Sequence, residues 1–422
     1  MVPAGPFASL IVAGASATVP ILLSAPLPTV VVACGGIALG VCTGLVPGLH
    51  ANTMALLLVA VAPAVPASPL ALATAMVAAG VVHTCLDVVP ALALGVPDPA
   101  MAASALPGHR LVVAGRGREA LRLSALGSGT ALLVAVPVAV PVTALAARSY
   151  SSVRAHFGVV VAAVVVALLA TEPTWRRRGV GLCGLAASGV LGAVALDVQT
   201  GGLAVGGPLP ALFGGLFGAP ILLDAVDGDG VPAQDDAALG LSPTGVGWAA
   251  LAGTVGGAAV GYLPGVSAGV ASTLALPATA GTAPDREYVV ATSAANTATA
   301  VFAVFALVAL GTPRSGVLVA VDRVGAPQAL APLLAATTLA GAVGVALVAP
   351  LGDRMLRAVG RVDPTRLSVG ALAGLVGLSA LLTGAVGVAM FAAATVVGLL
   401  PVAAGGRRVY LMGVLLVPVA TG

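Results

Sequence analysis

Two Pro-Gly breaks, each at the end of a long apolar run, constrain the fold of this chain more than any other feature. The first run ends at residues 40–48 (GVCTGLVPG) and the second at residues 257–265 (GAAVGYLPG). Proline and glycine end a helix, and backbone groups freed inside a bilayer must face protein or a water-filled cavity. The breaks therefore predict two discontinuous (Pro-Gly broken) or re-entrant helices, and such paired helices are typical of a transporter's binding site.

Composition places these breaks inside a membrane. Hydrophobic residues make up 59% of the 422 positions and charged residues only 8%, whereas soluble domains carry about 25% charged residues. Apolar runs of membrane-spanning length recur from end to end, which leaves room for about ten to twelve spans of ~20 residues each. We therefore predict an all-α integral membrane protein, a polytopic helical bundle in the cell (plasma) membrane, and exclude a soluble globular protein.

Arginine clusters define the expected orientation of the spans. Cytoplasmic loops carry an excess of basic residues, so we place three clusters inside: Arg110, Arg116, Arg118 and Arg122; Arg176, Arg177 and Arg178; and Arg354, Arg357, Arg361 and Arg366. Counting spans from these clusters puts the acidic segment at residues 197–243 outside, as an extracytoplasmic or interfacial linker. Residues 209–225 within it are expected to be re-entrant or interfacial, because a full crossing would place the third cluster outside.

The chain also repeats itself, and the second copy is expected to be inverted. The two Pro-Gly breaks share Gly, Gly, Pro and Gly at the same spacing, and a Gly-x-Pro break at residues 93–97 (ALGVP) recurs at residues 309–313 (ALGTP). Both pairs keep the same register to within one residue. The loop near Arg110 is expected inside and its counterpart near Arg323 outside. Residues 1–196 are thus predicted as the first transmembrane repeat and residues 244–422 as the second, within a single membrane domain.

Polar residues and helix ends at the breaks form the predicted substrate site. Free N–H groups at the start of a half-helix favour an anion, while free carbonyl groups at the preceding helix end favour a cation. The substrate-binding candidates are Gly44, Pro47, Gly48, His50, Asn52, Thr53, Pro97, Gly261, Pro264, Gly265, Ser267, Ser272, Asn296, Thr297, Thr312, Pro313 and Ser315. Asn52 and Ser267 have an alternative role, since each could cap the helix that follows.

A second set of residues is predicted to couple transport to a cation. His83 and Asp87 are four residues apart and share one helical face, and Asn296 occupies a similar depth in the second half. Ionisable groups inside spans typically relay protons or coordinate cations. An interfacial pair near the helix end is the alternative for His83 and Asp87. No catalytic residue and no metal site is predicted, because the sequence contains no nucleophile–base motif and no cluster with metal-ligand spacing.

Several segments carry a family resemblance over most of the chain. They are residues 40–48, 94–97 (LGVP), 106–109 (LPGH), 115–120 (GRGREA), 263–265 (LPG) with Ala268, Ala271 and Ser272, 287–296 (EYVVATSAAN) and 311–316 (GTPRSG). In these segments the chain resembles the TctA family, the large membrane subunit of tripartite tricarboxylate transporters, as a divergent and shorter member. The last segment corresponds to the family's Gly-Ile-Pro-Gly-Ser break.

The resemblance implies a secondary active transporter, a permease for a tricarboxylate- or dicarboxylate-like anion. It implies coupling to a cation gradient, with Na⁺ or H⁺ as coupling ion and no other cofactor, and alternating access around the paired broken helices. A small membrane subunit and an extracytoplasmic solute-binding protein are the implied partners, beside the lipid bilayer. No nucleic acid is expected, and a homo-oligomer is left open. The residues alone also fit a carrier of a phosphate-bearing or lipid-linked anion and, less well, an integral membrane enzyme.

Overall fold

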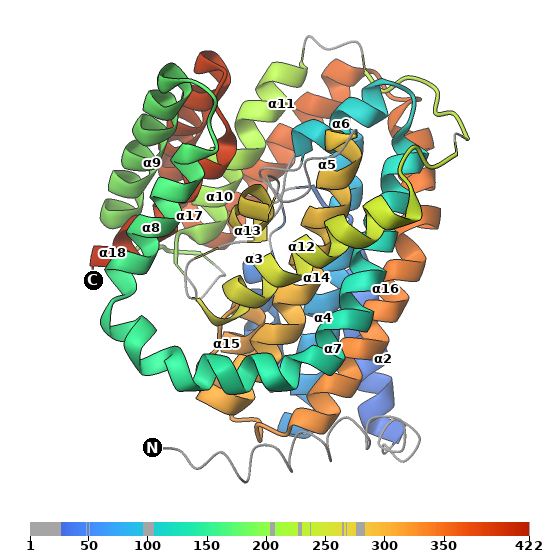
Figure 1. Ribbon diagram of the computed structural model, residues 1–422, viewed down its shortest axis with the longest axis vertical. Coiled ribbons are helices and arrows are strands. Elements are labelled where there is room, and N and C mark those ends of the chain that lie inside the picture. Colours follow the sequence, from blue (N-terminus) through green and yellow to red (C-terminus); the bar gives the residue numbers. More distant parts are fainter. Residues whose placement is uncertain are drawn as a thin grey trace.

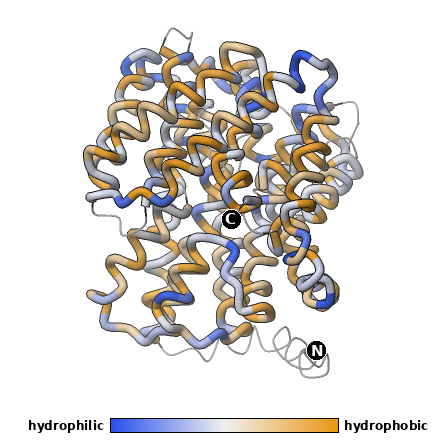
Figure 2. The backbone as a smooth tube through the Cα atoms, turned by 90° about the vertical axis from the view of Figure 1, so that its left-hand side faces the viewer, coloured by the Kyte–Doolittle hydropathy of each residue, from blue (hydrophilic) through white to orange (hydrophobic). Residues whose placement is uncertain are grey.

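The computed structural model describes residues 27–47, 49, 51–95, 105–202, 207–226, 230–236, 238–263, 266, 268–275 and 283–421. In this part of the chain every regular element is helical, which confirms the predicted all-α fold (Figure 1). Seven of the described helices are long and apolar enough to cross a membrane. Figure 2 shows hydrophilic residues concentrated at the turns between helices. The protein is therefore a multi-pass membrane protein.

Local sequence signals set several of the helix bounds. The helices are, in chain order, α2 (Leu27–Gly44), α3 (Ala51–Val61), η1 (Ala62–Ala64), α4 (Pro69–Leu86), α5 (Val88–Leu94), α6 (Ala105–Val113), α7 (Gly117–Ala155), α8 (Phe157–Ala170), α9 (Trp175–Ala195), α10 (Leu209–Phe213), η3 (Gly214–Gly218), α11 (Ala219–Ala225), α12 (Pro243–Tyr262), α13 (Ala268–Ala275), α14 (Pro284–Leu310), α15 (Gly316–Arg323), α16 (Leu330–Val359), α17 (Pro364–Ala404), η5 (Arg408–Met412) and α18 (Gly413–Thr421). Ser68 and Ser242 cap α4 and α12, and a proline follows each serine. Gly95 and Gly311 end α5 and α14 with φ angles of 70° and 61°, which glycine adopts without strain. The glycines of the two Gly-x-Pro breaks are thus matching helix ends.

α2 and α4 lie side by side and run in the same direction. Gly40 faces the backbone of Ala79, and Gly44 at the end of α2 faces that of His83; a Cβ added at either glycine would lie less than 3.0 Å from a carbonyl oxygen. The end of α2 at Gly44 therefore lies beside His83, near the end of α4 and far from the start of that helix at Pro69. α3 packs on α4 and leads the chain back to that start, where η1 makes the turn. α2 and α3 therefore form a re-entrant hairpin around the first Pro-Gly break.

α12 and α14 repeat this packing in the second half. Gly257 faces the backbone of Ala295 as Gly40 faces Ala79, and a Cβ at Gly257 would again lie less than 3.0 Å from the carbonyl oxygen. The offset is 217 residues for the glycines (257 − 40) and 216 for the alanines (295 − 79), as for the two break motifs. α13 then returns toward the start of α14, where Thr273 Oγ1 lies 3.5 Å from a tyrosine hydroxyl near that start. The second break is a second re-entrant hairpin.

The two hairpins enter from opposite ends of the molecule. α5 continues α4 and ends beside α6, where His109 Nδ1 lies 2.8 Å from the carbonyl oxygen of Leu92. An ion pair between Arg110 and Asp285 joins α6 to the start of α14, and the hydrogen bonds that the Arg110 guanidinium donates to Asp285 raise its pKa. α4 therefore runs toward the end at which α14 begins, and the two helices are antiparallel. The two hairpin units are therefore inverted relative to each other.

The helices form two groups, each with members from both halves. α2, α4 to α7, α12 and α14 to α16 share one large hydrophobic core and are here called the central group. α8 to α11, α17, η5 and α18 pack on one another as the lateral group, on the left in Figure 1. The two hairpin arms, α3 and α13, contact both groups. The arms of the Pro-Gly breaks thus lie where the two groups meet.

The expectation that residues 209–225 are re-entrant or interfacial is wrong. Gly202 packs against the backbone of Leu382 in α17, whereas the carbonyl oxygen of Val226 accepts a hydrogen bond from Thr365 Oγ1 at 2.8 Å. Thr365 and Leu382 are separated by about 26 Å of helix at 1.5 Å per residue. α10, η3 and α11 therefore lead the chain from one end of this part of α17 to the other, and all three pack against it. The segment runs between the two ends of the molecule.

The expected placement of the acidic linker, residues 197–243, opposite the arginine clusters is also wrong for its second part. The backbone N–H of Gly117 donates to Gln234 Oε1 at 2.6 Å, Arg116 Nη2 donates to the carbonyl oxygen of Ala238 at 3.2 Å, and Arg122 pairs with an aspartate of this stretch. Residues 230–242 thus lie on the first arginine cluster. The span count failed because it treated residues 209–225 as returning to the side on which they begin.

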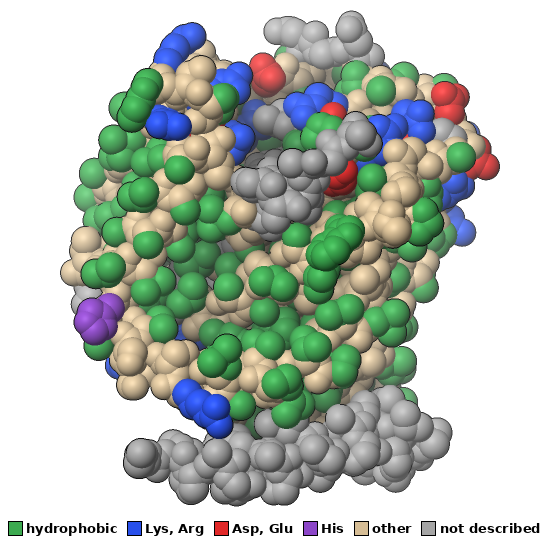
Figure 3. All heavy atoms as spheres, in the orientation of Figure 1, with side chains coloured by type: hydrophobic (Ala, Val, Ile, Leu, Met, Phe, Trp, Pro, Cys, Tyr) green, Lys and Arg blue, Asp and Glu red, His purple; other side chains and the backbone are tan. Residues whose placement is uncertain are grey.

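The arginine clusters themselves lie at one end, as expected. Asp353 Oδ1 accepts a hydrogen bond from Arg118 Nε at 2.7 Å, and the same carboxylate pairs with Arg357. The first and third clusters therefore meet directly. Figure 3 shows most of the visible basic side chains at the upper end, over both helix groups. We call this the arginine end.

Cysteine labelling can test this topology. In a variant without the four native cysteines, Asp236→Cys and Arg361→Cys are expected to react with a membrane-impermeant maleimide from the same side, and Arg323→Cys from the opposite side. All three positions are exposed, and α14 leads the chain from the arginine end to the end that carries Arg323. Labelling of Asp236→Cys and Arg361→Cys from different sides would contradict the corrected placement of the linker.

Candidate functional site

A cluster of polar side chains lies inside the central group, at the level of the first break. Thr43 is in the last turn of α2, His83 is in α4, Asp87 is between α4 and α5, and Asn296 is in α14. His83 Nδ1 lies 3.0 Å from Thr43 Oγ1, and Asn296 Nδ2 lies 3.4 Å from Asp87 Oδ2. Asn296 also donates to the carbonyl oxygen of Thr84 at 2.8 Å. The contact between Asp87 and Asn296 joins the two inverted halves.

The cluster is enclosed by protein. His83 is 0% exposed, and Asp87 and Asn296 are each 5% exposed. This burial argues against the alternative of an interfacial pair for His83 and Asp87, whose polar ends would reach water. An ionised carboxylate at this depth is costly unless donors or a cation compensate its charge. The cluster therefore has the electrostatic character of a cation or proton site.

A helix interruption brings the carboxylate to this position. α4 ends at Leu86 and α5 begins at Val88, with Asp87 between them. Pro90 has no N–H group, so the carbonyl group of Leu86 lacks its usual intrahelical donor. The N–H of Asp87 still donates to the carbonyl oxygen of His83 at 2.9 Å, which keeps the two helices in line. Asp87 consequently stays one turn beyond His83 on the face toward α14.

Oxygen atoms dominate the cluster, and this chemistry suits a small cation or a proton. A carboxylate together with backbone carbonyl and hydroxyl oxygens is the kind of ligand set that discontinuous transporter helices offer to Na⁺. A proton is the second option, because a buried carboxylate takes up a proton readily and the imidazole of His83 lies one turn away. Among the described residues, no group of three or more His, Cys, Asp and Glu side chains has the arrangement of a metal site.

Several predicted residues lie near this cluster. Gly44 ends α2 against His83, and Pro47 follows in the turn after α2. Thr297 is buried next to Asn296 on α14. Gly261 lies one residue before the end of α12, as the counterpart of Gly44 in α2, and packs against a phenylalanine of α14. Both hairpins therefore bring their last helical glycine against a long helix of the central group.

The second Gly-x-Pro break leads from α14 into α15, whose Val317 packs against Gly80, one turn before His83 on α4. Thr312, Pro313 and Ser315 follow the end of α14, which extends about 21 Å beyond Asn296 at 1.5 Å per residue. Ser315 Oγ accepts a hydrogen bond from the N–H of Leu318 at 3.3 Å and caps α15. The structure therefore does not bring these three candidates to Asp87. Gly48, His50, Pro97, Pro264, Gly265 and Ser267 lie outside the described residues, as do the side chains of Asn52, Thr53 and Ser272.

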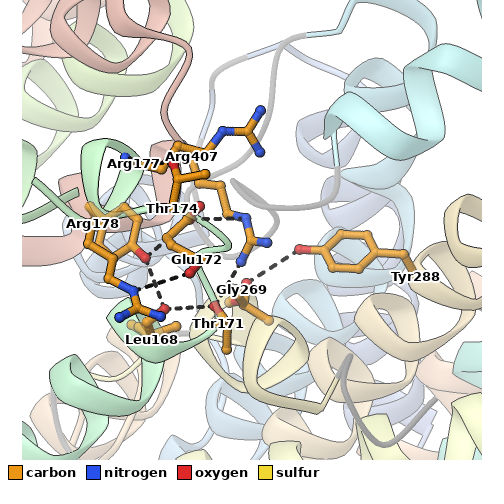
Figure 4. Close-up of polar contacts among 11 residues, drawn as sticks. Leu168, Thr171, Glu172, Thr174, Arg177, Arg178, Gly269, Tyr288 and Arg407 are labelled. Atoms are coloured by element: carbon orange, nitrogen blue, oxygen red, sulfur yellow. Dashed lines mark hydrogen bonds and ion pairs between the residues drawn. The ribbon is translucent and has the colours of Figure 1, made fainter. Parts of the chain in front are cut away.

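Sequence reasoning missed a second buried carboxylate. Glu172, in the turn between α8 and α9, is 1% exposed, and its Oε1 lies 3.1 Å from Arg407 Nε and 3.2 Å from the hydroxyl of Tyr410. Figure 4 shows Tyr288 of the central group pointing toward α13, on the side where Glu172 and Arg407 lie. A single glutamate between two apolar runs resembles an ordinary loop residue. Only its distant arginine and tyrosine partners mark it as part of a buried ion pair.

Thr43 was missed for a similar reason. Its hydroxyl donates to the carbonyl oxygen of Leu39 at 2.9 Å and lies 3.3 Å from Met54 Sδ, so it links α2 with α3 as well as with His83. A threonine within an apolar helix is usually satisfied by its own helix. Its position within the GVCTGLVPG motif was the one available signal.

Two inverted, re-entrant hairpins beside a buried polar cluster are the arrangement typical of one class of protein, the membrane transporters. Comparison with known proteins specifies the family. The profile of the "Tripartite tricarboxylate transporter TctA family" matches residues 30–413, and the chain belongs to this family. The printed name of this family is that of a transporter, which points away from an enzyme.

A more distant likeness extends over part of the chain. An uncharacterized protein of Methanocaldococcus jannaschii is 26% identical over 194 residues, which are 45% of this chain and 46% of that protein. The chain thus spans about half the length of this relative. No solved structure matches the chain.

Proposed function

We propose that this chain is the permease of such a transporter, and that it carries a di- or tricarboxylate across the plasma membrane together with Na⁺ or H⁺. The observation that carries the proposal is the contact of Asp87 with Asn296, in which a buried carboxylate of one half meets an amide of the other. Such a contact couples the two halves to the charge state of a single group. The family of the chain supports an anionic substrate and further subunits.

Electrostatics gives the order of binding that we expect. With no cation bound, the charge on Asp87 repels an anion that approaches the hairpins. A bound Na⁺ or H⁺ neutralises this charge and so raises the affinity for the carboxylate, and the coupling is reciprocal. The N–H groups at the starts of α3 and α13 would then receive the anion. Neither ligand alone gives the full gain in binding free energy.

Alternating access would arise from movement between the two helix groups. α3 and α13 contact both the central and the lateral group, whereas each group has its own hydrophobic core. A movement of one group past the other would therefore shift the hairpin arms, which pack into these cores through residues such as Met54 of α3 and Val270 of α13. We further propose a small membrane subunit and a solute-binding protein as partners, as the name of the family suggests.

Replacement of Asn296 by alanine tests the location of the site. The Asn296→Ala variant loses the donor to Asp87 and to the Thr84 carbonyl oxygen, and we expect uptake of radiolabelled citrate or succinate into proteoliposomes to fall at least about tenfold, with folded yield preserved. Thr338→Ala is the matched control, because the Thr338 hydroxyl bonds only to its own helix in the described structure. Uptake by Asn296→Ala equal to that of the control would refute the site.

A further inference from the structure

The second Gly-x-Pro break carries an arginine whose donors have no acceptor. Nε and Nη2 of Arg314 are buried, and among the described residues neither has a hydrogen-bond partner. The hydroxyl oxygen of Thr312, two residues earlier, is also buried and has no hydrogen-bond partner among the described residues. The Arg314 guanidinium lies over the ring of Tyr150 in α7, 5.4 Å from the ring centroid. A positive charge and three unused polar atoms thus gather at one break.

Such an arrangement is costly unless a ligand completes it. A guanidinium has five N–H donors and no acceptor, and a buried donor without a partner loses the hydrogen bonds it makes in water. The ring of Tyr150 attracts the charge and fixes its position, but it does not replace an oxygen acceptor. An anion with two oxygen atoms would satisfy Nε and Nη2 together, and Thr312 could donate to it as well.

The position of Arg314 suits a substrate that approaches from outside. Asp285, in the first turn of α14, pairs with Arg110 at the arginine end, and the helix ends about 38 Å away at Leu310. The arginine end is cytoplasmic by the distribution of basic residues, so Arg314 is at the opposite, extracytoplasmic end.

We propose that Arg314 and Thr312 bind a carboxylate group of the substrate on the extracytoplasmic side, before it reaches the hairpins. The inference rests on the proposed function and names a residue that selects the substrate. Arginine binds carboxylates in a bidentate manner, with more geometric specificity than lysine. A phospholipid headgroup carries similar oxygen atoms, but the donors concerned are enclosed by protein and not at its lipid-facing surface.

Binding measurements on the purified full-length protein test this site. Dissociation constants for citrate and succinate are obtained from ligand-dependent thermal unfolding in nanodiscs of zwitterionic lipid. Arg314→Gln is expected to raise these dissociation constants about 10- to 100-fold. Arg314→Lys is expected to raise them by less, because lysine keeps the positive charge but lacks the paired N–H donors of the guanidinium. Arg323→Gln removes an exposed arginine from the same end and is expected to bind as the wild type does. Without ligand, Arg314→Gln is expected to unfold at the wild-type temperature or above it, since the guanidinium has no hydrogen-bonded protein partner to lose.

Each possible result supports or overturns the carboxylate site at Arg314 and Thr312. Unchanged dissociation constants in Arg314→Gln, or a lower unfolding temperature without loss of affinity, would overturn the inference and leave the proposed function intact. Stabilisation of the wild type, but not of Arg314→Gln, by phosphatidylglycerol without carboxylate would show a lipid site and overturn it too. Failure of the wild type to bind citrate or succinate would overturn both proposals. Arg314-dependent binding without uptake into proteoliposomes would support the site and overturn the transport proposal.

Discussion

Asp87→Asn is expected to abolish the dependence of carboxylate uptake on a cation gradient. Asparagine keeps an oxygen that can accept the hydrogen bond from Asn296, so the contact between the two halves can persist. It has no charge to attract Na⁺ and no site for a transferable proton. An inward Na⁺ or H⁺ gradient should therefore accelerate uptake by the wild type and have no effect on the variant, whose uptake should equal the rate measured without a gradient.

Proteoliposomes with imposed gradients provide the measurement. Asp322→Asn is the matched control, because Asp322 is exposed near the end of α15 and far from the polar cluster. The control should respond to the gradient as the wild type does, and the cation that produces the response identifies the coupling ion. An Asp87→Asn variant that still accelerates with the gradient would remove Asp87 from the coupling role.

Gly40→Ala and Gly253→Ala are expected to destabilise the protein strongly. In each variant the new Cβ would lie less than 3.0 Å from the carbonyl oxygen of an alanine on the neighbouring long helix. The clash involves backbone on both sides, so no side-chain rotation can relieve it. Overpacking of this kind costs about 1–3 kcal/mol of unfolding free energy, and it forces apart two helices whose close contact depends on small residues.

Each substitution has a control on the same helix. Gly35 in α2 and Gly247 in α12 have no atom within 4 Å of an added Cβ. Gly35→Ala and Gly247→Ala should therefore be neutral or gain up to about 1 kcal/mol from the better helix propensity of alanine. Thermal unfolding in detergent compares the four variants. Equal midpoints for Gly40→Ala and Gly35→Ala would show that the close packing of α2 on α4 is not required for stability.

The repeat could be predicted from the sequence because the close packing of each hairpin requires particular residue types. Gly40 and Gly257 are needed where α2 and α12 approach a neighbouring backbone, and the glycines of the Gly-x-Pro breaks are needed where a helix ends at positive φ. The position of His83 and Asp87 on one helical face followed in the same way from the helical period. What could not be predicted was the partner of each group, such as Thr43 for His83.

The errors have a common origin in segments of intermediate length. Residues 209–225 comprise 17 positions, which fits a short crossing or a re-entrant arm equally well by hydropathy. Contacts with α17 decide for the crossing, and contacts of Gln234 with α6 and α7 place the following linker at the arginine end. Neither contact leaves a local pattern, because the partners are more than 100 residues apart in the chain.

The sequence by itself determined the membrane environment, the inverted repeat and the two Pro-Gly hairpins. All three depend on local chemistry: the share of apolar residues, the backbone freedom of glycine and the missing N–H of proline. Only the tertiary structure decided that Asp87 meets Asn296, that Glu172 pairs with Arg407, and that Arg314 has no protein acceptor. These facts depend on which distant surfaces pack together, and helix packing sums many weak contacts that no single segment of the chain contains.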